Sequence, residues 1–542
     1  MIILGVGGFQ HDFNAAAINT DTGEISAFEE ERFSRIKHHP ILGKESSSID
    51  SLNYVLKQVG GTPNAVKFIV FSDVQVHPLN RYLMQAFPAA VAFHVEHHVC
   101  HAAAAYYCSG FDDAAILSLD GFGDLKGGML AHGAGRNLRV ISNIEMENSI
   151  GLEYLRVTYQ LGLGSYGSEG KTQGLAPFGH PVFENDYFGE IELATDGRIV
   201  LSNRLKRMKE YIDGEHYIEE RSLFNDFIAE HITRRFKHEE IEQQHMDMAS
   251  SIQEVLNKVA LHSAQYLKKA TASKNLVLAG GVSQNSSMNG YILKSKVFEN
   301  VYSHPSSSDR GNALGAALYF ANEYLGQKMQ RSGPLVYAGP EYSDDQIRFA
   351  IESRKLRYDV LDEPTVEVAK LIANGAIVGW FQGRSELGAR ALGNRSILAD
   401  PRKKENIDII NAKVKHREWF RPFAPSVLVE HAEQWFETDR PLPYMQFTVP
   451  VLEERRSTVP AITHVDGSAR VQTVSKDFNP LYHDLITQFH TLTGVPLLLN
   501  TSFNDAGDPI VESPGDAIDC LLKTDLDCIV LGRYLVRNPK FL

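Results

Sequence analysis

The chain has 542 residues, which allows about three or four domains of ordinary size or two large ones. Hydrophobic residues make up 43% and charged residues 22%, and 42 glycines with 22 prolines are ordinary for a globular protein, so disorder and coiled-coil rods are excluded. The net charge of −13 disfavours general binding to nucleic acid.

The N-terminus is apolar only as far as Gly8, because His11 and Asp12 interrupt it, and it lacks the positive flank of a signal peptide. No uninterrupted apolar run approaches the roughly 20 residues that cross a bilayer. The four cysteines form no C-x-x-C pair and are too few for a disulfide framework, so we expect buried thiols. These features predict a cytoplasmic protein with neither a membrane nor nucleic acid among its partners.

Short apolar strands alternate with helical stretches in the first half of the chain, which is typical of an α/β domain. Two segments, 2–12 and 115–124, each run from an apolar strand into glycines flanked by Asp or His. Such a repeat would suit the two-lobed ATPase architecture of sugar kinases and actin, in which each lobe offers a hairpin to the nucleotide phosphates.

His97 and His101 are four residues apart and precede an alanine run that favours a helix. On a helix both imidazoles project from one face, which is a spacing of metal ligands. Position 98 is His where the zincin motif has its Glu, so that class of peptidase is not indicated. Asp120 and Asp309 stand just before glycines and could complete a site for iron, manganese or zinc. A structural role for the histidine pair is the alternative.

Further along, apolar positions spaced as on a helix run from Met248, and a strand over 276–279 leads into two glycines. The small residues of 311–317 predict a helix that packs closely or contacts a ligand. Gly-Pro pairs within 330–343 indicate a domain boundary.

Beyond this boundary, the segment from Arg384 to Arg421 contains ten basic residues and only five acidic ones. Arginines spaced through glycine turns can converge on an anion, whose oxygens a guanidinium group binds with two hydrogen bonds. Aromatic residues near this segment are limited to Trp419 and Phe420, so stacking on single-stranded nucleic acid is not favoured. A small phosphorylated ligand fits best, and a solvated basic face is the alternative.

With these motifs in place, the chain resembles the O-carbamoyltransferases that modify nodulation factors and antibiotics, a family that includes the aminoglycoside enzyme nebramycin 5′ synthase. The resemblance is nearly full length, and its supports are QHDFNAAA (10–17), EEERFSRIKHH (29–39), H-x-x-x-H with LDGFGD (97–124), GSEGKTQGLAPFG (167–179), LAGGVSQN (278–285), SDRGNALGAA (308–317), GARALGNRSILADPR (388–402), REWFRPFAPSVL (417–428) and NTSFN (500–504). It implies an actin-like ATPase domain over residues 1–335, similar to the tRNA threonylcarbamoyladenosine transferase. A YrdC-like α/β domain, similar to the enzyme that makes threonylcarbamoyl adenylate, is expected over 336–542.

The activity that this resemblance implies is ATP-dependent O-carbamoyl transfer. The second domain is expected to form carbamoyl adenylate from carbamoyl phosphate and ATP, releasing pyrophosphate. The first is expected to transfer carbamoyl to a hydroxyl of a small natural product or sugar, as in antibiotic biosynthesis. Expected cofactors are Fe²⁺, or another divalent transition metal, in the first domain and Mg²⁺ with ATP. A homodimer is a further expectation, and we assign the charged stretch 181–244 to the acceptor wall or to a dimer contact.

Carried over by position, the resemblance also implies the site residues. His11 and Lys37 match residues at the acceptor site, and the metal ligands are His97, His101, Asp120 and Asp309. Matches to the elements that hold the nucleotide in the first domain are Gly121, Gly123, Glu169, Lys171, Gly280, Gly281 and Asn285. Matches to residues that hold carbamoyl phosphate or ATP in the second domain are Arg390, Lys415, Arg421 and Arg470. After NTSFN many relatives have an arginine before Gly-Glu-Pro, whereas this chain has Ala506, so no phosphate contact is assigned there.

Two other interpretations remain open at this point. A fused tRNA-modifying threonylcarbamoyl transferase would use the same folds, but the net charge and the lack of a long basic stripe argue against it. An ATP-binding actin-like module without turnover is the alternative from a different class. The hydrogenase-maturation carbamoyltransferase is a further relative, but it carries paired C-x-x-C zinc sites, which this sequence lacks.

Overall fold

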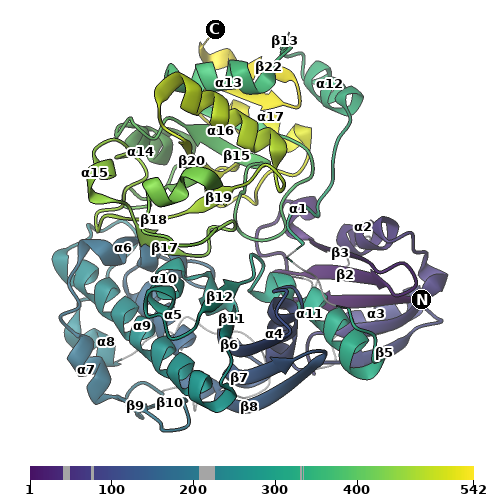
Figure 1. The fold of residues 1–542 in the computed structure, drawn as a ribbon, viewed down its shortest axis with the longest axis vertical. Coiled ribbons are helices and arrows are strands. Elements are labelled where there is room, and N and C mark those ends of the chain that lie inside the picture. The colour runs from purple at the N-terminus through teal and green to yellow at the C-terminus, as the bar shows by residue number, and fades with distance from the viewer. Residues whose placement is uncertain (41–48, 75–77, 207–225, 330–332, 334, 542) are drawn as a thin grey trace. The chain divides into compact units, whose positions relative to one another are not determined.

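The structure, a computed structural model, describes residues 1–40, 49–74, 78–206, 226–329, 333 and 335–541. The chain divides into two compact units (Figure 1). The first comprises Met1–Glu30 and His38–Pro334, and the second comprises Leu335–Leu542 together with the short segment Glu31–Lys37. The sequence analysis places the boundary between 335 and 336 and does not anticipate that segment 31–37 belongs with the second unit.

The first unit contains two five-stranded sheets of the same topology. In each, a central strand pairs antiparallel with the next strand of the chain on one side and parallel with a later strand on the other. The first sheet has the order β3 (Glu24–Glu29), β2 (Asn14–Asn19), β1 (Ile2–Gly7), β4 (Val66–Phe71) and β5 (Val91–His94). The second has the order β8 (Asn137–Glu145), β7 (Lys126–Ala134), β6 (Asp113–Gly123), β11 (Asn275–Ala279) and β12 (Asn300–Ser303). The central strands β1 and β6 are the two segments that resemble one another in sequence, so the predicted duplication is confirmed.

Helix α11 (Asn312–Tyr319) packs against both β1 and helix α4 (His97–Tyr107). Glycine permits this close packing, because a Cβ atom on Gly5 would lie 2.0 Å from the carbonyl oxygen of Ala313. Likewise, a Cβ atom on Gly315 would lie 1.9 Å from the carbonyl oxygen of Cys100. The first turn of α4 is held by the Glu96 side chain, which accepts from two backbone N–H groups. The predicted helices at 97–105 and 311–317 are therefore confirmed, and their packing brings their N-terminal ends together.

Helix α9 (Gln243–Thr271) crosses the same unit and contacts α5 (Ile150–Gln160), α6 (Glu169–Leu175) and α10 (Ser286–Lys294). A capping box of Glu242 and His245 starts it, and it ends at Ala272 in the left-handed conformation. It contains the helix predicted from Met248. Within the stretch 181–244, the described part holds α7 (Glu184–Gly189), β9 (Ile191–Leu193), β10 (Ile199–Leu201) and α8 (Asp226–His231). Residues 207–225 lie outside the described residues, and the role assigned to the stretch stays a prediction.

The second unit is built on an eight-stranded mixed sheet with both parallel and antiparallel pairs. Its order is β13 (Asp359–Val360), β22 (Tyr534–Arg537), β21 (Cys528–Leu531), β14 (Val378–Phe381), β15 (Arg395–Ala399), β20 (Leu497–Ser502), β16 (Ala424–Leu428) and β19 (Gln472–Val474). Helix α13 (Pro364–Ala373) packs on α16 (Pro480–Thr493), while α17 (Pro514–Lys523) packs on β21 and on α12 (Asp344–Ser353). The α/β class predicted for both halves of the chain is thus confirmed.

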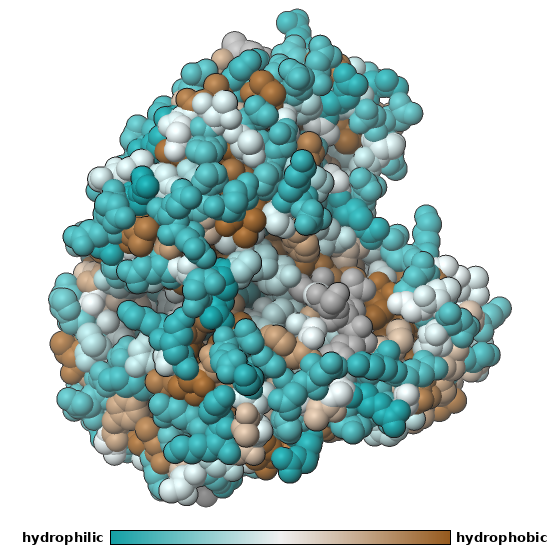
Figure 2. Space-filling view, in the orientation of Figure 1, coloured by the Kyte–Doolittle hydropathy of each residue, from teal (hydrophilic) through white to brown (hydrophobic). Residues whose placement is uncertain are grey.

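The four cysteines are buried free thiols, as predicted. Among the helices that the structure describes, none combines the length and apolar character needed to cross a membrane. The face drawn in Figure 2 is mostly hydrophilic, with hydrophobic residues in separate patches.

Candidate functional site

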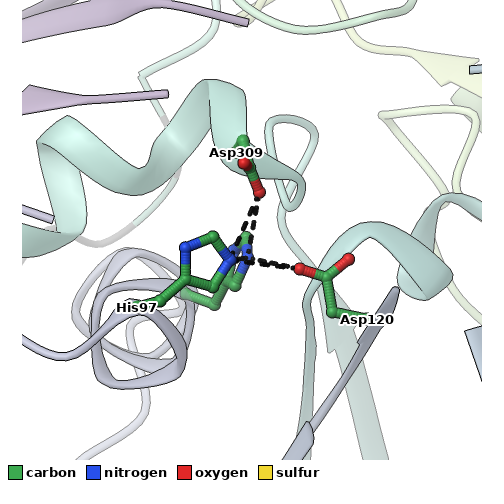
Figure 3. Close-up of side chains that lie close together, drawn as sticks. His97, Asp120 and Asp309 are labelled. Carbon is green, nitrogen blue, oxygen red and sulfur yellow. Dashed lines mark hydrogen bonds and ion pairs between the residues drawn. The ribbon is translucent and has the colours of Figure 1, made fainter. Parts of the chain in front are cut away.

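Two histidines and two aspartates from three elements meet in the first unit. His97 and His101 lie one turn apart on α4. Asp120 lies near the end of β6, and Asp309 begins the short helix η6 (Asp309–Gly311) that leads into α11. The Nε2 atoms of the two imidazoles are 3.0 Å apart, and Asp120 Oδ2 lies 3.2 Å from His97 Nε2 and 3.0 Å from His101 Nε2. Asp309 Oδ1 lies 3.4 Å and 3.3 Å from the same two atoms (Figure 3). The structure therefore brings together all four predicted metal ligands, which we call the His/Asp cluster.

The spacing and the charge of this cluster suit a divalent cation. Ligand atoms about 2.1 Å from one ion lie about 3.0 Å apart in octahedral and about 3.4 Å apart in tetrahedral geometry, which matches the separations above. Burial works against a charged imidazole, but Asp309 and Asp120 raise the pKa of His97 to about 10. In spite of burial, the imidazoles keep the pKa of Asp120 well below its usual range. In spite of its burial, the pKa of Asp309 is likewise lowered by His97 and His11, so both carboxylates attract positive charge. Two imidazoles and two carboxylates fit a transition metal ion.

Backbone groups and a glycine orient these ligands. Asp120 Oδ1 accepts hydrogen bonds from the N–H groups of Gly121 and Gly281, at 2.9 Å and 3.0 Å, and this turns its Oδ2 toward the imidazoles. A Cβ atom on Gly123 would lie 2.2 Å from the His97 ring. Three of the four glycines that the resemblance places in the nucleotide turns therefore lie directly against side chains of the His/Asp cluster.

His11 lies beside the cluster, in the turn that follows β1. Its Nδ1 is 2.9 Å from the hydroxyl of Tyr166, 3.3 Å from Asp12 Oδ2 and 3.6 Å from Asp309 Oδ2. Burial opposes the charged imidazole, but Asp309 and Asp12 raise the pKa of His11 above its ordinary value. Asp309 thus has one oxygen toward the imidazoles of His97 and His101 and the other toward His11.

Asp12 is a further functional candidate that the sequence analysis did not identify. Its Oδ1 accepts from Arg310 Nε at 3.1 Å and lies 2.9 Å from His38 Nδ1. Despite complete burial, Arg310 and the adjacent histidines hold the pKa of this carboxyl well below its usual range. Its backbone φ of 56° is rare for a residue other than glycine. The His-Asp pair after a glycine turn is the sequence signal that could have identified it.

The other residues matched to nucleotide-holding elements lie on nearby turns of the first unit. Glu169 and Lys171 lie in the first turn of α6, where burial raises the pKa of Glu169. Gly280 has a φ of 82° and approaches the carbonyl of Leu119. Asn285 is the N-cap of α10, with its side chain accepting from the N–H of Met288 at 2.9 Å, which is a structural role.

In the second unit, one edge of the sheet collects the predicted phosphate-binding residues. Strand β14 is antiparallel to β15, β15 to β20 and β20 to β16, while β16 is parallel to β19. The ends of β14 and β20 and the starts of β15, β16 and β19 therefore lie at the same edge. Arg390 precedes β15, Lys415 and Arg421 precede β16, and Arg470 ends β18 (Ser468–Arg470) just before β19.

Lys415 follows a π-helical turn, Ile410–Val414, and its ammonium group is enclosed by neutral oxygens. Its Nζ donates to the carbonyls of Ser502 and Asn504 at 2.9 Å and 2.7 Å, and to the side-chain oxygens of the same residues. Burial and the charge of Arg417 lower the pKa of Lys415 well below its ordinary value. The NTSFN motif thus supplies the acceptors that hold this lysine, a link that no local pattern in the sequence reveals.

Three arginines extend this positive region. Burial and the mutual repulsion of the guanidinium groups lower the pKa of Arg417 and Arg470, the latter to about 10. Burial also lowers the pKa of Arg421, although the carboxylate of Glu418, 3.7 Å from Arg421 Nη1, opposes this effect. We call Lys415, Arg417, Arg421 and Arg470 the cationic cluster; Arg417 was not among the predicted site residues. Four positively charged side chains that lie close together repel one another, and a bound anion would offset this repulsion. The cationic cluster therefore indicates an anion site.

Two further predicted residues lie around this cluster. Arg390 is half-buried in the loop between β14 and β15. The carbonyls that follow it accept hydrogen bonds from the side chains of Asn500 and Gln472, which anchors the loop at the same edge. Lys37, which the resemblance places near His11, belongs to the second unit, where its charge contributes to lowering the pKa of Lys415.

Comparison with known proteins finds a family match within each unit. Residues 82–318 match the family model described as "Carbamoyltransferase N-terminus", and residues 369–538 match "Carbamoyltransferase C-terminus". Nodulation protein NolNO of Sinorhizobium fredii is 39% identical over 564 aligned positions, which cover 98% of this chain and 79% of that protein. The chain belongs to the carbamoyltransferase family. It is therefore an enzyme that transfers carbamoyl groups, and the interpretation as a module without turnover is set aside.

The chain is also similar to a further curated relative and, weakly, to a solved structure. The 3′-hydroxymethylcephem-O-carbamoyltransferase of Amycolatopsis lactamdurans is 36% identical over 247 positions, 45% of each chain. Among solved structures, HypF of T. kodakarensis aligns with a TM-score of 0.32 and 16% identity, over 60% of this chain and 48% of that one.

Proposed function

We propose that this carbamoyltransferase is an ATP-dependent O-carbamoyltransferase that divides two half-reactions between its two units. In the second unit, carbamoyl phosphate, ATP and water give carbamoyl adenylate, pyrophosphate and phosphate. In the first, the carbamoyl group passes to a hydroxyl and AMP leaves. The observation that carries this proposal is the cationic cluster. Four basic side chains at one edge of the sheet can bind the several negatively charged oxygens of a polyphosphate.

The chemistry explains why such a cluster is needed. A carbamoyl group is a poor electrophile because its nitrogen donates into the carbonyl, so transfer needs a good leaving group such as AMP. As pyrophosphate leaves ATP, negative charge grows on its oxygens, and cations fixed in advance stabilise it without reorganising. Lys415 and the three arginines are suited to this task, with Mg²⁺ bound by ATP. The YrdC-like assignment of the second unit and the actin-like assignment of the first belong to this proposal, supported by the mixed sheet and by the duplicated sheets.

His11 is suited to accept the proton of the acceptor hydroxyl. In the tautomer that carries its proton on Nδ1, the imidazole donates to Tyr166 or Asp12 and leaves Nε2 as the base. The His/Asp cluster would hold a divalent transition metal ion, and such an ion supplies a Lewis acid for the adenylate. Asp309, which lies next to both His11 and the imidazoles, fixes the base relative to the metal-binding side chains.

The proposed acceptor is a hydroxyl of a small natural product or sugar. The name of the Amycolatopsis relative describes transfer to the oxygen of a hydroxymethyl group, which supports an alcohol as the acceptor class. The net charge of −13 argues against tRNA as the substrate.

Mass spectrometry of small-molecule extracts tests this function. The extracts are incubated with the enzyme, ATP and either unlabelled or isotope-labelled carbamoyl phosphate. We expect a product about 43 Da heavier than its precursor, the mass of a carbamate substitution, whose mass rises further by that of the label when labelled carbamoyl phosphate is used. A product that forms only when threonine is supplied would contradict the proposal and support the tRNA-modifying alternative.

A further inference from the structure

The segment Glu31–Lys37, which includes helix α1 (Glu31–Ser34), leaves the first unit and belongs to the second. Its arginines hold backbone carbonyls there. Arg35 Nη1 donates to the carbonyl of Ile510 at 2.7 Å and its Nη2 to the carbonyl of Pro509 at 2.8 Å. Arg32 Nη2, which is buried, donates to the carbonyl of Gly388 at 2.8 Å. We call this segment the strap.

Both loops that the strap holds lead to residues of the proposed phosphate site. The carbonyl of Asp508, next to Pro509, accepts from Asn504 Nδ2 at 2.6 Å, and Asn504 in turn holds the ammonium group of Lys415. Gly388 lies two residues before Arg390 in the loop between β14 and β15. Arg35 is therefore linked to Lys415 by hydrogen bonds at either end of the 504–510 turn, which the backbone from Asp508 to Pro509 connects.

The backbone of the strap indicates that this arrangement is constrained. Arg35 has a φ of 60°, which residues other than glycine rarely adopt. Its guanidinium group faces two carbonyls and Asp516, whose Oδ1 lies 3.5 Å from Arg35 Nε. Such a conformation persists where its surroundings over-determine it, and these are often functional sites. In addition, Lys37 adds a positive charge beside Lys415.

We propose that the strap is a positioning element for the phosphate site of the second unit, with Arg35 fixing the turn that orients Lys415. This inference rests on the proposed function. Arg35 would act on phosphate binding indirectly, through the position of Lys415. The alternative is a tether that only joins the two units, in which case its arginines do not affect affinity for phosphates.

Calorimetry distinguishes a positioning strap from a simple tether, because it measures the affinity of the full-length enzyme for carbamoyl phosphate. Arg35→Met keeps the side-chain stem and removes both hydrogen bonds, and we expect at least a tenfold higher Kd. Arg348→Met, which removes an exposed arginine of the same unit, serves as the matched control and should change the Kd less than twofold. An unchanged Kd in Arg35→Met would overturn the proposal.

A second variant guards against misfolding. Arg35→Lys keeps the charge but has a single nitrogen in place of the planar guanidinium fork, so it does not reproduce the paired geometry in which Nη1 and Nη2 each bind one carbonyl. We therefore expect a Kd nearer to that of Arg35→Met than to that of the parent, with an unchanged melting temperature. If Arg35→Lys binds as the parent does, fixation of the turn is refuted. Failure of the proposed function is distinguishable, because it appears as absence of carbamoyl-phosphate-dependent pyrophosphate release in the parent enzyme itself.

Discussion

His11 and Lys415 are the side chains whose surroundings best separate the two proposed half-reactions. His11 lies among Tyr166, Asp12 and Asp309 in the first unit. Lys415 is enclosed by oxygens of Ser502 and Asn504 in the second. Because these environments share no residue, substitutions at the two positions should affect different steps.

Replacing His11 with Asn should abolish carbamoyl transfer while leaving carbamoyl-phosphate-dependent exchange of pyrophosphate into ATP normal. Loss of a general base typically costs a factor of about 10² to 10⁴ in rate. The two activities are measured separately, with supplied carbamoyl adenylate for the transfer step. His180→Asn, at an exposed histidine of the same unit, is the control. Unimpaired transfer in His11→Asn would refute the role of the base.

The reverse pattern is expected for Lys415→Met. Removing the ammonium group takes a charge from the phosphate site and leaves the carbonyls of Ser502 and Asn504 without their donor, so exchange should fall on the order of a hundredfold or more. Transfer from supplied carbamoyl adenylate should be retained. Lys413→Met, two residues earlier and exposed, should affect neither assay. Equal loss in both assays for Lys415→Met would count against separate sites.

Individual site residues can be predicted from the sequence where they follow a regular spacing. Residues that reach the site only through contacts between distant segments cannot be predicted in this way. The H-x-x-x-H spacing on a helix predicts that His97 and His101 share one face, and they do. Asp12, Tyr166 and Arg417 are different, because their positions depend on segments far away in the chain. No local pattern links Lys415 to the NTSFN motif.

Among the secondary-structure elements, the contact of strand β6 with helix α4 decides the geometry of the His/Asp cluster. Gly123, at the end of β6, lies against the imidazole of His97. A methyl group there would overlap the ring, so the ring must move away from Asp120 and Asp309.

Gly123→Ala should therefore weaken metal binding without unfolding the first unit. We expect at least a tenfold lower affinity for a divalent transition metal, measured by titration of the metal-free protein with Fe²⁺ or Zn²⁺. Gly189→Ala, on helix α7 where a Cβ atom meets nothing within 4 Å, should bind as the parent does. Equal affinities of the two variants would mean that His97 is not a ligand.

The repeated strand and glycine turn in the sequence anticipates the two sheets of equal topology, because a duplicated local pattern folds twice in the same way. The order of the eight-stranded sheet is not predictable in this manner. Its neighbours β15, β20 and β16 are far apart in the sequence, and their pairing depends on packing of the whole unit. Segment 31–37 joins the second unit through side-chain contacts that composition does not reveal.

Across the whole molecule, a buried carboxyl makes stability depend on pH. Glu512 accepts from the hydroxyl of Ser385 at 2.6 Å and lies 3.8 Å from Arg395, and burial raises its pKa from 4.5 to about 7. A group with a raised pKa stabilises the fold while it stays protonated. That contribution is fully present below about pH 4.5 and is lost as the pH rises through about 7.

Glu512→Gln, which mimics the protonated form, should melt like the parent at pH 5 and at a higher temperature than the parent at pH 8. The difference in the free energy of unfolding should reach up to about 3 kcal/mol for the unit that contains it. Glu433→Gln, at an exposed position of the same unit, should show no such pH dependence. A difference between Glu512→Gln and the parent that does not change with pH would contradict this account.

The proposed formation of carbamoyl adenylate, on which the division into two half-reactions depends, is tested most directly by the products formed from ATP. The purified enzyme is incubated with carbamoyl phosphate and ATP labelled at the α and γ phosphates, without an acceptor, and the labelled products are separated. Formation of carbamoyl adenylate predicts that the γ label appears in pyrophosphate and the α label in the adenylate or AMP. Release of ADP and labelled phosphate, or ATP that stays intact, would contradict it.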